Sequence, residues 1–251
     1  MAKGTKPPEH GGQVMQRILG TALVVLLTTV AIILALAPVT HQRKVLPASI
    51  DNAHLVSHWG TFGNLTEPDC VVAAQGDLIQ LWSAQQGHSV TVTRLTRELQ
   101  REWPILSRST ETRVLRSLQY WEIHPLGGIR AVTTEAINPS QRTLIERAIS
   151  DLDGVELDLT LPAAVVSAHP PRVWRSDAPG KHVGHMLAAV GYNRDGLIAI
   201  AWGHPVLITW RFFKATAHEP VAAVLPTGLR RTRLSQIVSL FDSPGYELGA
   251  A

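Results

Sequence analysis

The sequence predicts an α+β fold, with helices in the first half of the domain and an antiparallel sheet in the second half. Two patterns carry this prediction. Between residues 70 and 153 apolar residues recur at helical spacing, and from residue 155 they alternate with polar residues as in half-buried strands. After the N-terminal segment about 200 residues remain, which is enough for one domain with a substantial core.

The N-terminal segment combines a slightly basic leader at 1–17 with a run of 23 uncharged residues at 18–40. Because a helix of about 20 apolar residues crosses a bilayer, we expect one transmembrane helix there. The basic leader favours a cytoplasmic N-terminus, so we expect a single-pass membrane protein with an extracytoplasmic domain. The alternative is a protein secreted after signal-peptide cleavage, because Ala35-Leu36-Ala37 has the small-x-small form of a cleavage site.

The rest of the chain divides into a linker, a domain and a tail. We expect a juxtamembrane linker at 41–57, the domain at 58–226 and a C-terminal tail at 227–251. In the tail, apolar residues from Leu234 to Phe241 recur at helical spacing after a group of arginines. An amphipathic helix is therefore expected there, which packs on the domain or contacts a membrane surface or a partner.

Four helices are predicted inside the domain. They lie at 70–85, at 93–103, at 111–122, and from Asn138-Pro139-Ser140 to about Asp153-Gly154. Each stretch has apolar residues at spacings of three and four, and helix-breaking proline or glycine follows the second and third stretches.

The predicted strands lie at 155–161, 185–192, 197–202, 206–213 and 221–225. The first alternates apolar and acidic or hydroxyl residues, which is typical of a strand with one buried face. The turn sequence Asn193-Arg194-Asp195-Gly196 predicts a hairpin between the second and third strands. A loop is expected from His169 to Gly180, where prolines interrupt the pattern.

Cys70 is the only cysteine of the chain, so no internal disulfide can form. Pro68 and Asp69 predict a helix start with Asp69 as the N-cap, which puts Cys70 in the first turn of a buried helix. Free N–H groups and the helix dipole at that position lower a thiol pKa, whereas the neighbouring Asp69 charge raises it. Cys70 is therefore a candidate nucleophile.

His185 begins an apolar strand that ends in Gly191-Tyr192. Taken alone, a histidine at a strand end is more typical of a hydrogen-bonded structural residue. Together with a cysteine at a helix start 115 residues upstream, it becomes a candidate general base.

These two motifs resemble those of the papain-like cysteine peptidase superfamily, within which the likeness is greatest to bacterial and phage C39-like or papain-like domains. The similar segments cover about residues 58–226 and are Gly63-Asn64 with Asp69-Cys70, Tyr120-Trp121 to Gly127-Gly128, Val155-Glu156-Leu157 into Leu161-Pro162, His185 to Tyr192, and Trp202-Gly203 with Ile208-Thr209-Trp210. The resemblance implies a papain-like fold with a central helix that bears Cys70. It also implies an oxyanion-hole amide at Asn64, where the family more often has glutamine.

The sequence departs from the family pattern at Ile200, where papain-type enzymes have an asparagine that orients the catalytic imidazole. Three readings follow. Cys70 and His185 act as a dyad, or Asp195, Asn193 or His204 orients the ring from another position, or the fold is kept and activity is lost. An orienting partner fixes the imidazole tautomer, so its loss lowers the rate of catalysis.

The resemblance implies a thiol hydrolase of the cysteine-peptidase class, which cleaves peptide or amide bonds of a peptide, a protein or the peptide part of peptidoglycan. With the uncharged run at 18–40, we expect this hydrolase to be membrane-anchored. Two other classes stay open. One is a cell-wall peptidase of the NlpC/P60 type, although that family usually continues Cys-Ser-Gly where this chain has Val71-Val72. The other is an inactive papain-like module that binds a partner.

Charge and histidine patterns argue against two further classes. The formal net charge is +3 and the basic residues are scattered, so we expect no nucleic-acid partner. His182, His185 and His204 lack acidic or thiol ligands at a recognisable zinc spacing. We therefore expect neither a metal nor another cofactor.

Overall fold

The computed structural model describes residues 45–66, 69–106, 113–166, 169–175, 181–217 and 219–228. The predicted leader at 1–17, the predicted transmembrane helix at 18–40 and nearly all of the tail lie outside these residues. Within the described ranges, none of the helices has the length and apolarity needed to cross a membrane.

Helix α2 (Cys70–Gln85) has the predicted bounds and is the central helix of the folded unit that begins at Leu46. Every residue from Val71 to Ser83 is buried, including the polar ones. The apolar stripe expected from helical spacing is therefore only part of its buried surface. Polar side chains on a helix buried on all sides need internal partners, and Gln75 Nε2 donates to the Ser117 hydroxyl at 2.6 Å, whereas Gln75 Oε1 has no partner among the described residues.

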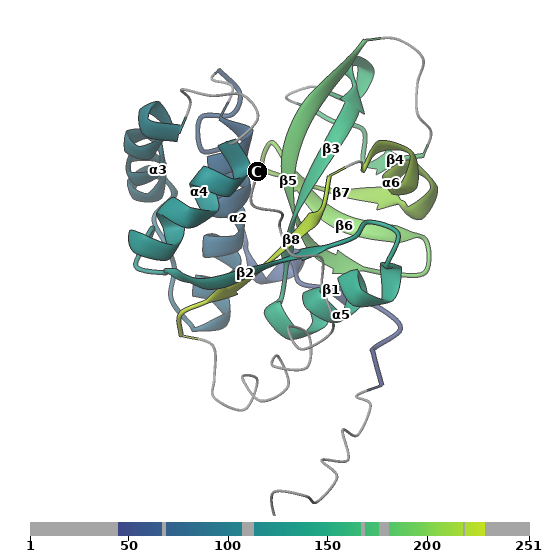
Figure 1. The fold of residues 1–251 in the computed structure, drawn as a ribbon, viewed down its shortest axis with the longest axis horizontal. Helices are drawn as coiled ribbons and strands as arrows, with labels where there is room; N and C mark the ends of the chain where they lie inside the picture. Colours follow the sequence, from purple (N-terminus) through teal and green to yellow (C-terminus); the bar gives the residue numbers. More distant parts are fainter. Residues whose placement is uncertain are drawn as a thin grey trace, which may run out of the picture. The chain divides into compact units, whose positions relative to one another are not determined.

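The other helices surround the sheet and α2. They are α3 (Val92–Leu106), α4 (Arg113–Ile123), α5 (Arg142–Leu152) and the short α6 (Trp210–Thr216), with 3₁₀ turns η1 (Ala53–Leu55) and η2 (Ala163–Val165). Figure 1 shows α2, α3 and α4 gathered on one side, and α5 and α6 beside the strands. The predicted linker is partly folded, because η1 and the first strand lie within it.

The described strands form one eight-stranded sheet in the order β2-β8-β3-β5-β6-β7-β4, with β1 paired to β5. Their bounds are β1 Ile50–Asp51, β2 Ala131–Ile137, β3 Val155–Pro162, β4 Val173–Trp174, β5 His182–Tyr192, β6 Gly196–Ala201, β7 His204–Thr209 and β8 Val221–Pro226. Neighbours are antiparallel except β4 and β7, which are parallel. The predicted α+β class is confirmed.

Three segments differ from the prediction. The predicted strand at 206–213 ends at Thr209, whose hydroxyl accepts a hydrogen bond from the Phe212 N–H and so starts α6. Short apolar runs do not distinguish strand from helix by spacing alone, and the side-chain cap decides in favour of the helix. Strand β2 was not predicted, and β4 lies inside the expected loop from His169 to Gly180.

The sheet has a separate hydrophobic core on each face. Along β5, Leu187 and Ala189 belong to the core that contains α5 and α6, whereas Ala188 and Val190 belong to the core that contains α2. This follows from the alternation of side chains along a strand. Strand β5 therefore contacts α2 directly.

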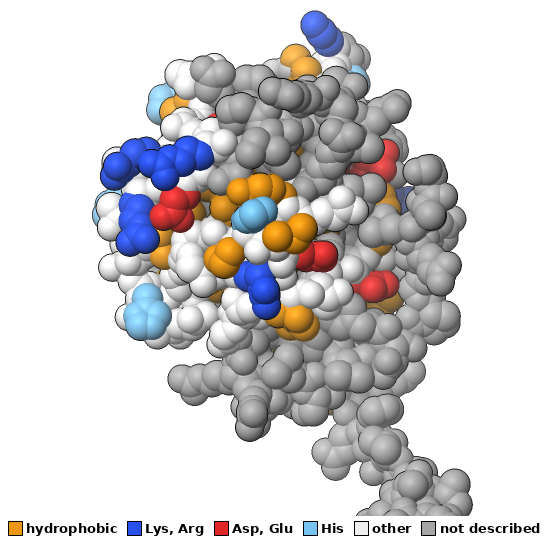
Figure 2. Space-filling model, turned by 60° about the vertical axis from the view of Figure 1, so that its left-hand side comes forward, with side chains coloured by type: hydrophobic (Ala, Val, Ile, Leu, Met, Phe, Trp, Pro, Cys, Tyr) orange, Lys and Arg blue, Asp and Glu red, His pale blue; other side chains and the backbone are white. Residues whose placement is uncertain are grey.

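Figure 2 brings forward the side of the molecule that carries α3 and α4 in Figure 1, with basic side chains near one edge and apolar side chains around a histidine. On α3, Arg94, Arg97 and Arg101 are exposed at spacings of three and four, and Arg94 pairs with Glu98 at 3.0 Å. On α4, Ile123 is exposed. The arrangement is typical of a solvent-facing helix surface.

Candidate active site

The segment before α2 is tied to the middle of that helix. The Gly60 N–H donates to Gln80 Oε1 at 2.8 Å, and Gln80 Nε2 donates to the His58 carbonyl at 3.2 Å. The buried Phe62 ring lies so close to Gly76 that a Cβ on that glycine would come within 2.7 Å of it. Residues 58–62 are thereby fixed over α2, and the chain must turn to reach the helix start.

The turn places Gly63 against the Asp69 side chain. Phe62 and Gly63 both have left-handed backbone angles, with φ of 49° and 96°, and a Cβ on Gly63 would lie 2.7 Å from Asp69 Oδ2. Asp69 is 1% exposed, and its side chain makes no capping bond to α2. Asp69 thus occupies the predicted N-cap position, but its side chain does not cap the helix.

Cys70 is the first residue of α2 and packs against Val71, Ala74 and Met186. The backbone N–H groups of Met186 and Val71 donate to its sulfur. Strand β6 pairs with β5 only from Ala188 onward, so β5 has no β6 neighbour at Met186. That open edge gives the start of α2 room to meet β5.

The surroundings of Cys70 raise the pKa of its thiol. Burial is the largest cause, and the negative charges of Asp158 and Asp69 add to it, whereas the N–H groups of Met186 and Val71 lower the pKa. The sequence predicted two opposing contributions, a lowering one from the helix start and a raising one from Asp69, and both act on the thiol. Burial was not visible in the sequence, and it outweighs the two N–H groups.

His185 lies on β5 immediately before Met186, so Cys70 and His185 are brought to the same corner of the molecule. The imidazole is 6% exposed, and burial lowers its pKa to about 4. Its Nε2 has no hydrogen-bond partner among the described residues, and none of the hydrogen bonds described joins it to Cys70. At neutral pH this corner therefore holds an uncharged thiol and an uncharged imidazole.

The imidazole stacks on the indole of Trp202, with ring centroids 4.5 Å apart and planes inclined by 21°. Trp202 and Gly203 form the turn between β6 and β7, and both have positive φ, at 47° and 79°. A tryptophan in this conformation is uncommon, and glycine at the second position avoids further strain. The turn fixes the indole over the His185 ring.

Asn193 and Asp195 do not lie near His185. They belong to the hairpin at the other end of β5, eight residues away from it at Asn193, which corresponds to about 26 Å along a strand. The Asn193 side-chain oxygen accepts from the N–H groups of Asp195 and Gly196, at 2.8 and 3.0 Å. The hypothesis that either residue orients the imidazole is therefore wrong.

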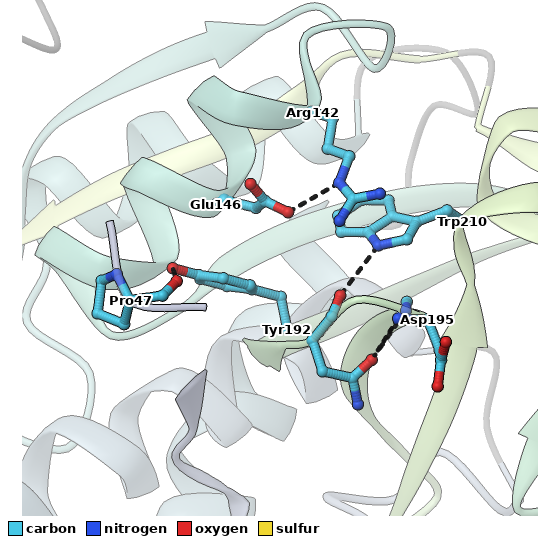
Figure 3. A network of polar contacts seen from close by, with 8 residues as sticks. Pro47, Arg142, Glu146, Tyr192, Asp195 and Trp210 are labelled. Carbon is cyan, nitrogen blue, oxygen red and sulfur yellow. Dashed lines mark hydrogen bonds and ion pairs between the residues drawn. The ribbon is translucent and has the colours of Figure 1, made fainter. Parts of the chain in front are cut away.

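Figure 3 shows the polar network around this hairpin. Trp210 Nε1 donates to the Asn193 carbonyl at 3.1 Å, and the Arg142 guanidinium stacks 4.2 Å from the Trp210 ring while its Nε pairs with Glu146 at 2.8 Å. The Tyr192 hydroxyl donates to the Pro47 carbonyl at 2.9 Å. These contacts give the hairpin residues a structural role.

The remaining predicted residues lie closer to the His185 end. His204 is exposed at the start of β7, beside the Trp202–Gly203 turn, and its ring lies 6.2 Å from that of His169. Asn64 is partly buried in the turn after Gly63, and its N–H donates to the Thr61 carbonyl at 2.9 Å. Its side-chain amide makes no hydrogen bond to another described residue. In the described part of the chain no group of acidic, histidine or cysteine residues is arranged to hold a metal.

Sequence reasoning missed the role of Asp158. The β3–β5 register places it opposite Met186, and its charge contributes to the raised pKa of Cys70. Burial and the nearby charge of Glu219 raise the pKa of Asp158 itself to about 6. The alternating pattern of 155–161 marked this residue as polar, but the pairing register that brings it to Cys70 is not visible in one sequence.

A cavity of about 660 Å³ lies elsewhere, between α5, α6 and the ends of β2 and β8. Trp210, Phe213, Arg142 and Lys214 are among its lining residues, and Cys70 and His185 are not. This cavity is therefore separate from the candidate active site formed by Cys70 and His185.

No protein-family model and no curated protein matches the chain. Its structure is similar to the crystal structure of the Carica candamarcensis cysteine protease CMS1MS2 in complex with E-64, with a TM-score of 0.51 and 14% sequence identity over 71% of this chain and 98% of that chain. At this identity the likeness concerns the fold alone. The chain thus has a fold similar to that of a papain-like cysteine protease, as the resemblance in the sequence implied.

Proposed function

We propose that the protein is a membrane-anchored thiol hydrolase that cleaves peptide or amide bonds with Cys70 as nucleophile and His185 as base. One observation carries the proposal. Cys70 starts a buried central helix, and its sulfur accepts a hydrogen bond from the N–H group that follows His185, in a fold similar to that of a cysteine protease. This is the pairing of residue types that nucleophilic catalysis by a thiol needs.

The reaction begins with proton transfer from the Cys70 thiol to the His185 imidazole. The thiolate attacks the acyl carbonyl, and the backbone N–H of Cys70 together with the Asn64 amide donates to the oxyanion. The imidazolium then protonates the leaving amine as the C–N bond breaks, which leaves a thioester on Cys70. Water, deprotonated by His185, attacks the thioester, releases the acid and restores the thiol.

Before substrate binds, the surroundings of Cys70 and His185 favour proton transfer during the attack over a preformed thiolate–imidazolium pair. Burial disfavours both the thiolate and the imidazolium, so the thiol and the imidazole are both uncharged at neutral pH. The Trp202 stack holds the ring without a hydrogen-bonding partner. In this proposal the stack replaces the asparagine that papain-type enzymes use.

Anchoring and substrate class belong to the proposal. The uncharged run at 18–40 supports a membrane anchor with an extracytoplasmic domain, and secretion after cleavage of that run is the alternative. A peptide, a protein or the peptide part of peptidoglycan is the proposed substrate. Relationship to C39-like bacterial and phage domains rests on the sequence motifs given above.

The second candidate function is that of an inactive module that binds a peptide or protein. The observation that favours it is Ile200, which is 1% exposed and packs in the core beside α2, so that it offers the imidazole no hydrogen bond. The raised thiol pKa of Cys70 points in the same direction.

Hydrolysis of a mixed library of internally quenched peptides by the full-length chain tests the proposal. We expect hydrolysis that is lost in Cys70→Ala and strongly reduced in His185→Ala, with His124→Ala as a control on an exposed histidine of the surface near α4. No hydrolysis by the folded wild type, or equal hydrolysis by Cys70→Ala, would leave the binding module as the better account.

A further inference from the structure

We propose that the cavity between α5, α6 and the ends of β2 and β8 binds the phosphate headgroup of an anionic phospholipid. The inference goes beyond the proposed hydrolysis, and it rests on the membrane anchor that belongs to the proposed function. The lining of the cavity, its charge and its place beside the point where the chain enters the folded unit support this assignment.

The cavity lies close to that entry point. The folded unit begins at Leu46, and the Tyr192 hydroxyl fixes the next residue by donating to the Pro47 carbonyl at 2.9 Å. Burial and the nearby charge of Glu146 raise the pKa of Tyr192, and Glu146 in turn pairs at 2.8 Å with Arg142, which lines the cavity (Figure 3). A short series of contacts therefore connects Pro47 with the cavity.

The entry point is also close in sequence to the uncharged run at 18–40. Residues 41–46 separate the end of this run from Pro47, and an extended chain covers at most about 25 Å over that stretch. Basic residues next to a membrane-spanning helix attract anionic lipids, and tryptophan is enriched at the level of the headgroups. For a run that crosses the bilayer, the chain length therefore allows headgroups to reach this part of the domain.

The polar side chains of the lining offer hydrogen-bond donors. Asn138 Oδ1 accepts from the N–H and the hydroxyl of Ser140, at 2.9 and 2.7 Å, which leaves the amide NH₂ group of Asn138 for a ligand. Arg142 and Lys214 can only donate. The charged oxygens of a phosphodiester only accept, and their bonds to arginine and lysine are charge-assisted. The donors of this cavity therefore match a phosphate group.

Arg142 is held in place without a ligand. Its Nε pairs with Glu146, and its guanidinium lies 4.2 Å from the centre of the Trp210 ring. The other N–H groups of Arg142 have no partner among the described residues, and Lys214 is exposed without an ion pair in the same part of the chain. A guanidinium fixed in this way loses little side-chain freedom when it binds a phosphate.

The charge and the size of the cavity fit one headgroup. Both charged residues among its described lining residues are basic, and the nearby acids Glu146 and Glu219 are not among them. The volume of about 660 Å³ lies in the range of small-ligand sites. Trp210 and Phe213 supply apolar lining, which suits the glycerol and the first carbons of the acyl chains.

The test uses the full-length chain, extracted in a non-ionic detergent, with lipid binding followed by native mass spectrometry. We expect one molecule of dihexanoyl phosphatidylglycerol per chain, bound about tenfold more tightly than dihexanoyl phosphatidylcholine, because choline offsets the phosphate charge. The double variant Arg142→Gln/Lys214→Gln should bind phosphatidylglycerol about 25-fold more weakly, since each basic residue near an anionic lipid contributes about fivefold.

Two further variants serve as controls. Lys214→Gln alone removes an exposed side chain without an ion pair among the described residues, so it should fold as the wild type does and lose about fivefold in affinity. Arg97→Gln/Arg101→Gln removes the same charge as the double variant from the exposed surface of α3 and should bind as the wild type does.

Peptide hydrolysis by the same proteins separates this inference from the proposed reaction, because Cys70 and His185 do not line the cavity. Equal binding of both lipids, or an equal loss in the α3 control, overturns the lipid site and leaves the hydrolase standing. Binding of glycerol 3-phosphate as tightly as phosphatidylglycerol overturns the assignment to a lipid in favour of a soluble phosphate ester. Recovery of the full-length chain from cells without detergent overturns the anchor and this inference together.

Discussion

Polar groups at the two ends of strand β5 differ in whether they have hydrogen-bond partners. At the Tyr192 end, the hairpin oxygens of Asn193 accept three hydrogen bonds, from two backbone N–H groups and the Trp210 indole. At the His185 end, an imidazole nitrogen is buried without a partner among the described residues, and the charges of buried Asp69 and partly buried Asp158 raise the pKa of the Cys70 thiol.

This difference in hydrogen bonding distinguishes polar residues with a structural role from polar residues available for catalysis. A polar group that is fully hydrogen-bonded stabilises a turn and has no capacity left for a substrate. A buried polar group that lacks a partner lowers stability, and such groups gather where a ligand completes the set. The predictions below test whether the His185 end is reactive and the Tyr192 end structural.

The largest effect is expected from removing the nucleophile. Cys70→Ala should lower kcat of peptide hydrolysis by on the order of 10⁴-fold or more, because the thioester can no longer form. Asn193→Ala should leave kcat unchanged and lower the free energy of unfolding by about 1–2 kcal/mol through its lost hydrogen bonds. Steady-state kinetics and urea unfolding measure the two quantities. Loss of activity in a folded Asn193→Ala protein would contradict the division between the two ends.

The next effect concerns Glu156, which pairs with Ala188 in the middle of β5. It is fully buried, both oxygens lack partners among the described residues, and burial raises its pKa to about 8. In the unfolded chain the glutamate ionises near pH 4.3, so the folded state binds more protons between these values and stability falls as pH rises through them.

Glu156→Gln removes this titration. Between pH 5 and pH 8.5 the free energy of unfolding of the variant should therefore rise relative to the wild type by about 4 kcal/mol, the linkage value for a shift of this size. Urea unfolding across this range measures the difference, and Glu122→Gln on α4 serves as the control. A pH-independent difference would mean that Glu156 is ionised in the folded protein.

A smaller effect is expected from Trp202→Leu. Loss of an aromatic stack worth about 0.5–1.5 kcal/mol should lower kcat by roughly threefold to tenfold if the indole positions the imidazole. Water that replaces the indole should also raise the pKa of His185 from about 4, which shifts the acidic limb of the pH–rate profile to higher pH. Trp210→Leu, at the other end of β5, should change stability and leave this limb in place.

The smallest effect is expected at Asp158. Its charge raises the pKa of the Cys70 thiol, so Asp158→Asn should raise the thiolate fraction and speed alkylation of Cys70 by iodoacetamide at pH 7.5, by about twofold to fivefold. The rate in both proteins should climb with pH because the thiol pKa is raised. Asp195→Asn should react at the wild-type rate. Equal rates for all three proteins would show that Asp158 does not face the sulfur.

Local patterns predicted much of the fold. Helix α2 and the hairpin of β5 and β6 were predicted because their spacing and turn residues act over a few positions. Strand β2 was missed because Ala131–Ile137 is only partly buried and so lacks strict alternation. The start of α6 was missed because the Thr209 cap is a single side-chain bond inside an apolar run.

The candidate site shows where such reasoning stops. Cys70 and His185 were identified because each begins a predicted element and together they fit one chemistry, although β5 itself begins at His182. The net direction of the thiol pKa shift could not be predicted, because burial and cross-strand charge depend on tertiary structure. Asn193 and Asp195 follow the strand of His185 closely in sequence, but they are eight and ten positions from it. At about 3.3 Å per strand residue, that distance keeps them away from the imidazole.

The most direct measurement of the central claim is the rate at which Cys70 is acylated by a peptide ester, followed by intact mass spectrometry of the full-length chain. We predict one acyl group per chain, located on Cys70, and a rate that falls by about 10²-fold or more in His185→Ala, the usual contribution of a positioned base. His124→Ala should acylate at the wild-type rate. An absent adduct, or equal acylation rates with and without His185, would contradict the pairing of the two residues.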